Sequence, residues 1–158
     1  MNDTKAYHSG QHIIIHTDGA CIGNPGPGGW AAIVQLLEGS KELKRKALTG
    51  SARKTTNNRM ELMAAIEALK LVTSGKPVVL RSDSQYVVKG ITERLPDWIA
   101  RGWRTAGKTP VKNRELWEEL SALVEVRSVA WEWVRGHNGD PVNEEADRLA
   151  NAAARMAC

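Results

Sequence analysis

The sequence predicts an α/β protein of the mixed α+β kind, built on one sheet that combines an antiparallel meander with parallel strands. The first fifty residues contain three strand-like segments separated by turn residues, and no helical pattern. The rest of the chain alternates helical and strand-like segments, which is typical of crossovers that cover a sheet with helices. At 158 residues one core is enough. We therefore expect a single domain over residues 1–158, with residues 1–10 as a flexible N-terminal extension.

The first three strands are predicted from apolar runs between turns. Residues 13–15 are isoleucines that lead to Asp18, and the Gly/Pro cluster at residues 23–29 follows as a turn. Residues 30–37 and 41–49 are the next two strands. A dinucleotide-binding loop is excluded, because the glycines alternate with prolines and lead into a strand rather than a helix.

The later elements follow from changes in the period of the apolar residues. Residues 57–73 have a helical period, and either Thr56 or Asn57 can cap the helix. The remaining predictions are strands at 77–80 and 129–134, short helices at 84–90 and 95–101, an exposed loop at 102–112, and helices at 113–124 and 143–157.

The composition excludes several classes of protein. No apolar run approaches the roughly 20 residues that cross a bilayer, and the polar N-terminus does not read as a signal peptide. Cys21 and Cys158 lie far apart without metal-type spacing, which suits free thiols in a reducing compartment. We therefore expect a cytoplasmic protein with no membrane contact, monomeric by default and without an obligate protein partner.

The net charge of +4 is unevenly distributed along the chain. Residues 41–59 and 89–114 are strongly basic, whereas residues 115–147 are mostly acidic. The basic stretches suit a polyanionic partner such as nucleic acid, although charge runs are more often simply solvated faces.

Four acids occupy positions that suit a shared site. Asp18 and Asp83 each follow an apolar strand, where open α/β sheets form ligand crevices. Glu61, expected in the first turn of its helix, and Asp147, in the last helix, each lie along an apolar stripe. Taken singly, such acids are explained as turn formers or as partners of the helix dipole.

Taken together, the four acids indicate a metal site. Neighbouring carboxylates repel or take up protons unless a cation lies between them. Oxygen ligands without a Cys or His cluster favour Mg²⁺, with Mn²⁺ as a substitute. Two such ions about 3.5 to 4 Å apart would suit phosphodiester hydrolysis.

Five segments of the sequence resemble type 1 ribonuclease H, the bacterial ribonuclease HI family: TDGACIGNPGPGGW, TTNNRMELMAAIEAL, SDSQYVVKGI, DWIARGWRTAGKTPVKN and WEWVRGHNGDPVNEEAD. The resemblance implies a ribonuclease H-like fold with a five-stranded mixed sheet. It also implies Mg²⁺-dependent endonucleolytic cleavage of the RNA strand of RNA/DNA hybrids, leaving 5′-phosphate and 3′-hydroxyl ends. The family's carboxylate quartet falls on Asp18, Glu61, Asp83 and Asp147.

The resemblance assigns further residues. His137, between glycines, matches a mobile histidine that assists proton transfer or product release. The polar residues with which the family lines the 2′-hydroxyl groups of the RNA strand map onto Cys21, Asn24, Asn57, Asn58 and Gln85. A phosphate pocket for the DNA strand maps onto Thr56, Asn113 and Lys54, where the family often has arginine. The basic protrusion at residues 94–112 carries Trp98, Arg101, Trp103 and Arg104. Because Ile99 and Ala100 stand where lysines are common, we expect weaker hybrid binding.

Three other classes of protein compete with this interpretation. A binding module that had lost catalysis would lack one of the acids, and all four are present. DNA nucleases of the integrase, transposase or resolvase kind usually carry three acids and are not expected to contain NPGPGGW together with TTNNRMELM. A purely structural protein would leave the acids in the apolar stripes unexplained.

Overall fold

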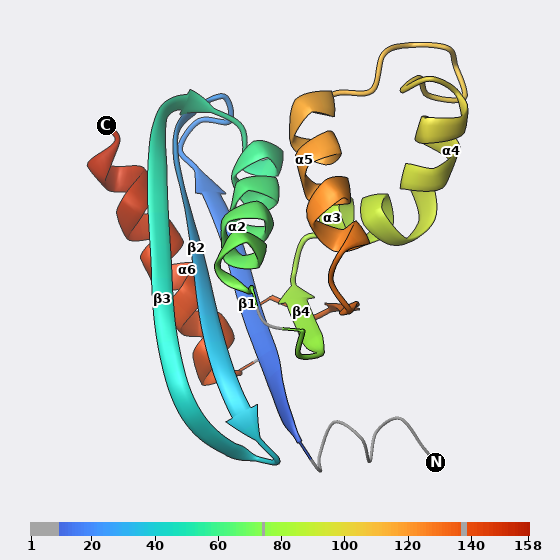
Figure 1. Ribbon diagram of the computed structural model, residues 1–158. Coiled ribbons are helices and arrows are strands. Elements are labelled where there is room, and N and C mark those ends of the chain that lie inside the picture. The colour runs from blue at the N-terminus through green and yellow to red at the C-terminus, as the bar shows by residue number, and fades with distance from the viewer. Residues whose placement is uncertain (1–9, 74, 137–138) are drawn as a thin grey trace.

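A five-stranded mixed sheet forms the centre of the molecule (Figure 1). The computed structural model describes residues 10–73, 75–136 and 139–158, so the expected N-terminal extension lies outside the described residues except for residue 10. The strands are β1 (Gln11–Cys21), β2 (Gly26–Glu38), β3 (Lys41–Thr55), β4 (Val78–Ser82) and β5 (Val129–Trp133). Their order in the sheet is β3-β2-β1-β4-β5.

The pairing of the strands confirms the predicted fold class. β1 pairs antiparallel with β2, which pairs antiparallel with β3. β1 also pairs in parallel with β4, and β4 in parallel with β5. The N-terminal meander therefore joins the α/β part of the chain through β1, the central strand.

Helices cover both faces of this sheet. They are α2 (Asn57–Leu71), α3 (Gln85–Lys89), α4 (Leu95–Ala100), α5 (Arg114–Glu125) and α6 (Pro141–Met156), with a π-helical segment η1 (Gly90–Arg94) between α3 and α4. Helix α2 lies over one face and α6 over the other, and α5 packs beside α2 (Figure 1). Thr56 is the residue that caps α2, since its Oγ1 accepts a hydrogen bond from Arg59 N at 3.2 Å.

Several boundaries differ from the prediction. Much of the Gly/Pro cluster belongs to β2, which begins at Gly26, and β3 continues to Thr55. The two predicted short helices are joined through η1 instead of being separated. Helix α6 begins at Pro141, because the carboxylate of Asp140 accepts hydrogen bonds from the backbone of Val142 and Asn143.

The main core lies between the sheet and the layer formed by α2 and α5. Ile15 and Leu80 of the sheet, Ile66 of α2 and Trp117 of α5 are all buried in this one cluster. The ring of Trp98 packs edge-on against that of Trp117, with 5.2 Å between their centroids. The segment containing α4 is thereby anchored to the core although it projects away from the sheet.

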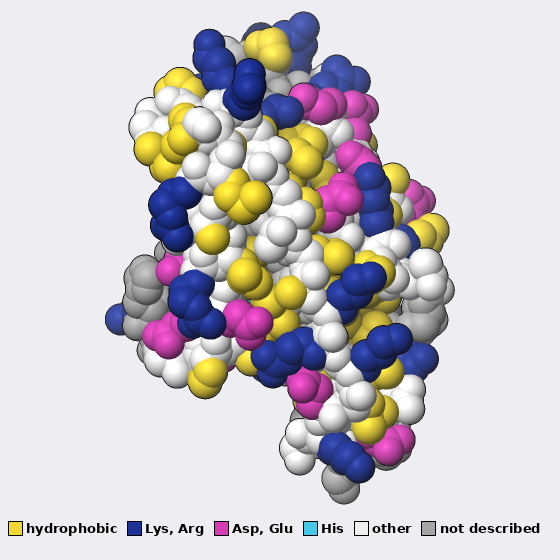
Figure 2. All heavy atoms as spheres, turned by 90° about the vertical axis from the view of Figure 1, so that its left-hand side faces the viewer, with side chains coloured by type: hydrophobic (Ala, Val, Ile, Leu, Met, Phe, Trp, Pro, Cys, Tyr) yellow, Lys and Arg dark blue, Asp and Glu magenta, His cyan; other side chains and the backbone are white. Residues whose placement is uncertain are grey.

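Strand β3 forms an edge of the sheet, and its first seven residues are exposed. Figure 2, which faces the side formed by β3 and α6, shows Lys and Arg side chains spread over this surface with acids between them. Arg45 pairs with Glu42 at 2.7 Å and with Glu145 of α6 at 2.9 Å. This part of the first basic stretch is a solvated, partly paired edge, which also protects the strand from edge-to-edge association.

Candidate active site

Asp18, Glu61 and Asp83 converge at the carboxyl ends of β1 and β4. One carboxylate oxygen of each lies within 4.8 Å of those of the other two. The parallel register explains why Asp18 and Asp83 meet. Thr17 is paired with Ser82, so the residues that follow them, Asp18 and Asp83, lie at the same edge. The predicted meeting of these acids therefore arises from the central position of β1.

Glu61 reaches the cluster from α2, but not from the first turn. It is the fifth residue of the helix, and that first turn contains no acid. A favourable interaction with the helix dipole therefore does not account for this glutamate. Gly19 accounts for its proximity, because a Cβ at that position would lie 2.6 Å from the backbone nitrogen of Glu61. The absence of a side chain at Gly19 lets β1 and α2 approach closely.

Asp147 approaches from the other face of the sheet. Its carboxyl group lies close enough to that of Asp18 to raise the pKa of Asp18, and Asn151 Nδ2 donates to Asp147 Oδ1 at 3.3 Å. Helix α6 packs closely on β2 at Gly29, where a Cβ would lie 2.6 Å from the carbonyl oxygen of Ala150. The fourth predicted acid therefore lies near Asp18, but it is not one of the three acids whose oxygens lie within 4.8 Å of one another.

Burial and mutual repulsion make this cluster unfavourable on its own. Desolvation, the charge of Asp83 and the nearby carboxyl group of Asp147 together raise the pKa of Asp18 to about 8. Burial raises the pKa of Glu61 well above its ordinary value, helped by Asp18 and Asp83. Among the described residues, Glu61 Oε1 has no hydrogen-bond partner. A buried, unpaired carboxylate oxygen within an all-oxygen cluster fits a hard divalent cation.

A second feature is a cavity of about 340 Å³ between the start of α2 and the start of α5. Its lining brings together five residues expected to bind substrate with Lys112: Asn24, Thr56, Asn57, Asn58, Lys112 and Asn113. The turn between β1 and β2 is held to the start of α2, because Asn24 Oδ1 accepts a hydrogen bond from Asn57 N at 2.9 Å. Lys54 is exposed on β3 and is not among the lining residues.

Asn113 also lines the cavity and has an unusual conformation. Its φ of 61° is left-handed, and its side chain makes no capping bond to α5. Instead, Oδ1 accepts from Arg59 at 3.1 Å and Nδ2 donates to the Tyr86 hydroxyl at 3.0 Å. Sequence reasoning placed Lys112 in the basic protrusion but not in the phosphate pocket, and it did not assign Arg59 to the site. Lys112 had a signal in its position next to Asn113, whereas Arg59 had none.

The other expected substrate contacts lie around these two features. Cys21 is half-buried, with Sγ 3.4 Å from the carbonyl oxygen of Thr55, and Gln85 is exposed at the start of α3. His137 lies outside the described residues.

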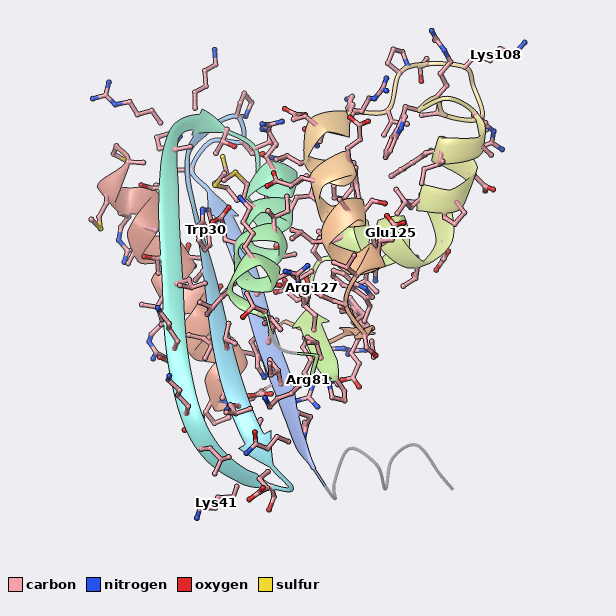
Figure 3. The ribbon with its side chains drawn as sticks, in the orientation of Figure 1. Trp30, Lys41, Arg81, Lys108, Glu125 and Arg127 are labelled. Atoms are coloured by element: carbon pink, nitrogen blue, oxygen red, sulfur yellow. The ribbon has the colours of Figure 1, made fainter. Side chains whose placement is uncertain are left out.

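The projecting segment combines packing with exposed charge. Trp98 and Trp103 pack partly against the core, whereas Arg101 and Arg104 are exposed. The guanidinium of Arg114 lies 5.6 Å from the centroid of the Trp103 ring. Figure 3 shows Lys108 at the outer end of this segment. Trp98 and Trp103 therefore contribute to packing, and their contact with substrate stays a prediction.

Comparison with known proteins agrees with this geometry. The family model described as RNase H matches residues 10–155. The chain belongs to the ribonuclease H family. Ribonuclease H of Xanthomonas campestris pv. campestris is 56% identical over 138 residues, which cover 87% of this chain and 89% of the relative. Ribonuclease H of Polynucleobacter asymbioticus is 55% identical over 151 residues, covering 96% and 95%. This chain is accordingly a nuclease of the ribonuclease H type.

Solved structures of the ribonuclease H family share the fold. The crystal structure of LC9-RNase H1, described as a type 1 RNase H with the type 2 active-site motif, superposes with a TM-score of 0.83 at 36% identity, covering 94% of this chain and 74% of that one. LC11-RNase H1, solved in complex with an RNA/DNA hybrid, gives a TM-score of 0.68 at 25% identity, covering 92% and 98%. The expected ribonuclease H-like fold is confirmed.

Proposed function

We propose that this protein is an endonuclease that hydrolyses the RNA strand of RNA/DNA hybrids and leaves 5′-phosphate and 3′-hydroxyl ends. The observation that carries the proposal is the convergence of carboxylate oxygens from Asp18, Glu61 and Asp83 within 4.8 Å. The structure of LC11-RNase H1 with an RNA/DNA hybrid supports the substrate class.

Asp18, Glu61, Asp83 and Asp147 are the residues that would hold Mg²⁺ or Mn²⁺. Bound as a pair, such ions would activate the attacking water and stabilise the leaving oxygen of a phosphodiester. The chain itself supplies the buried negative cluster, its separation from solvent, and the binding surface. In this proposal the cavity at Asn24, Thr56 and Asn113 receives a backbone phosphate of the hybrid.

Cleavage of a strand-labelled RNA/DNA hybrid tests the proposal, alongside duplex DNA, duplex RNA and single-stranded RNA. We expect cutting confined to the RNA strand of the hybrid, dependent on Mg²⁺ or Mn²⁺ and abolished by a chelator. Ligation of the products would identify their ends. Binding of the hybrid without any cutting in either metal would instead identify a binding module.

We predict that His137→Ala slows turnover by about 10²-fold, at the lower end of what a lost proton-transfer group costs. The residue lies between Gly136 and Gly139, and imidazole titrates near neutral pH. Measuring kcat from pH 6 to 9 at saturating hybrid checks this. A loss of kcat as large as that in a carboxylate variant would mean that His137 contributes more to catalysis than we propose.

A pair of lysine variants tests which cation serves the phosphate cavity. Lys112 lines the cavity and Lys54 does not. We expect Lys112→Ala to raise KM for the hybrid by about 3- to 10-fold and to lower the salt slope of binding by about one. Lys54→Ala is the matched control, with a smaller effect on both. A larger effect of Lys54→Ala than of Lys112→Ala would mean that Lys54 is the cation of the phosphate pocket.

We also propose a monomeric protein of the cytoplasm. Two free cysteines, Cys21 and Cys158, support a reducing compartment. In the part of the chain that the structure describes, no helix combines the length and the apolar character needed to span a membrane. Light scattering after gel filtration would test the monomer.

A further inference from the structure

Trp133, the last residue of β5, has an exposed indole that makes one specific contact. Its side chain is 44% exposed, and its Nε1–H donates to the backbone oxygen of Asp83 at 3.1 Å. The strand ladder alone does not require this bond. Val134 N already donates to Ser82 O at 2.9 Å, which continues the pairing of β4 with β5. The indole therefore holds the carbonyl one residue beyond that ladder.

The chain after β5 also lies against the other end of the same aspartate. A Cβ added at Gly136 would stand 2.9 Å from Asp83 Oδ2 and 3.7 Å from its Cβ and Cγ. A side chain at residue 136 would thus have to displace the carboxylate. Trp133 and Gly136 together contact both the backbone and the carboxylate of Asp83.

Asp83 depends on such contacts more than its neighbours in the cluster do. Asp18 lies within a paired stretch of β1 and Glu61 within α2, and they are only 6% and 4% exposed. Asp83 is half-buried and follows the end of β4, a strand of five residues. Its backbone oxygen lies beyond the pairing of β4 with β5, so a shift of the chain at this residue would carry the carboxylate away from Asp18.

We propose that Trp133 and Gly136 form a cradle that positions Asp83 for metal binding, with Trp133 as a positioning residue and Gly136 as the position that must lack a side chain. The inference rests on the proposed function only in treating Asp83 as a metal ligand. A hydrogen bond to the Asp83 carbonyl holds the backbone of this residue in place, and the close approach of Gly136 to the carboxylate keeps it directed towards Asp18 and Glu61.

Two tryptophan variants test the first half of the cradle. Trp133→Phe removes the donor and keeps an aromatic ring. Trp131→Phe is the matched control on the same strand, because Trp131 Nε1 is buried without a hydrogen-bond partner among the described residues. In Trp133→Phe we expect Mg²⁺ and Mn²⁺ binding to weaken by about 3- to 10-fold, as for one lost hydrogen bond, with KM for the hybrid unchanged. Trp131→Phe should keep the metal affinity.

Two glycine variants test the second half. Gly136→Ala is expected to weaken metal binding by more than about tenfold, in the range of lost support around a ligand. Gly75→Ala is the control, since a Cβ there meets nothing within 4 Å and the backbone is not left-handed. Wild-type metal affinity in Gly136→Ala would overturn this half of the proposal.

A measurement on the metal-free protein separates the cradle from the nuclease function. The amide of Ser84 belongs to the peptide whose oxygen Trp133 holds, and it donates to Ser82 Oγ at 3.0 Å. We expect Trp133→Phe to shift the Ser84 amide resonance and Trp131→Phe to leave it in place. An unshifted resonance together with wild-type metal binding would overturn the positioning role. A shifted resonance in a protein that never cleaves hybrids would retain the cradle and reject the proposed function.

Discussion

Asp18→Asn is expected to reduce hybrid cleavage by at least about 10³-fold while raising the stability of the metal-free protein. Asp18 is the member of the cluster that faces all the others, since Glu61, Asp83 and Asp147 each affect it or are affected by it. An amide keeps the size of the side chain but removes a charge that is buried among like charges. Function and stability should therefore change in opposite directions.

The gain in stability should depend on pH. A carboxyl group whose pKa rises from 3.8 to about 8 on folding binds its proton more tightly in the folded state. Its effect on the free energy of unfolding is absent below pH 4 and increasingly destabilising as pH rises to 8. The asparagine variant should therefore gain most above pH 8, by about 1 to 3 kcal/mol, and nothing near pH 4.

Thermal unfolding in a chelator at pH 4, 6 and 8.5, with turnover in Mg²⁺, measures both effects. Glu125→Gln is the control, because Glu125 is exposed at the end of α5 and should change stability by less than about 0.5 kcal/mol. A strong loss of stability with retained cleavage in Asp18→Asn would contradict both the electrostatic account and the proposed site.

The sequence predicted the parts of this site that depend on local pattern. An apolar run followed by an acid identified Asp18 and Asp83, and the parallel pairing of β1 with β4 brings those positions together. The helical stripes likewise identified Glu61 and Asp147 as acids in unfavourable places. These positions could be predicted because each depends only on the period of the apolar residues in its own strand or helix.

Features that depend on contacts between distant segments were missed. Arg59 reaches Asn113 across 54 positions of sequence, and no local pattern marks that contact. The continuity of α3 with α4 was also missed. Gly90, which ordinarily favours a helix end, is instead packed under the ring of Trp117. Tertiary packing overrode the local preference in this segment.

Gly19→Ala is the second variant for which we expect a large effect, a loss of about 2 to 3 kcal/mol in the free energy of unfolding. The new methyl group would lie 2.6 Å from the backbone nitrogen of Glu61 and 2.8 Å from the carbonyl carbon of Met60. Both atoms belong to the backbone of α2, whose inner face is buried in the core, so no flexible side chain can move aside.

The same variant should also reduce turnover, because separation of β1 from α2 moves Glu61 away from Asp18. A displacement of about 1 Å at a reacting centre can cost on the order of 10²-fold in rate. Gly107→Ala is the control, since its Cβ would meet only Thr105 Oγ1 at 3.8 Å. Urea unfolding and kcat at a temperature where both variants remain folded would measure the two losses separately. A destabilised Gly19→Ala protein with wild-type kcat would mean that α2 shifts without disturbing Glu61, and that the close approach at Gly19 serves packing rather than the carboxylate cluster.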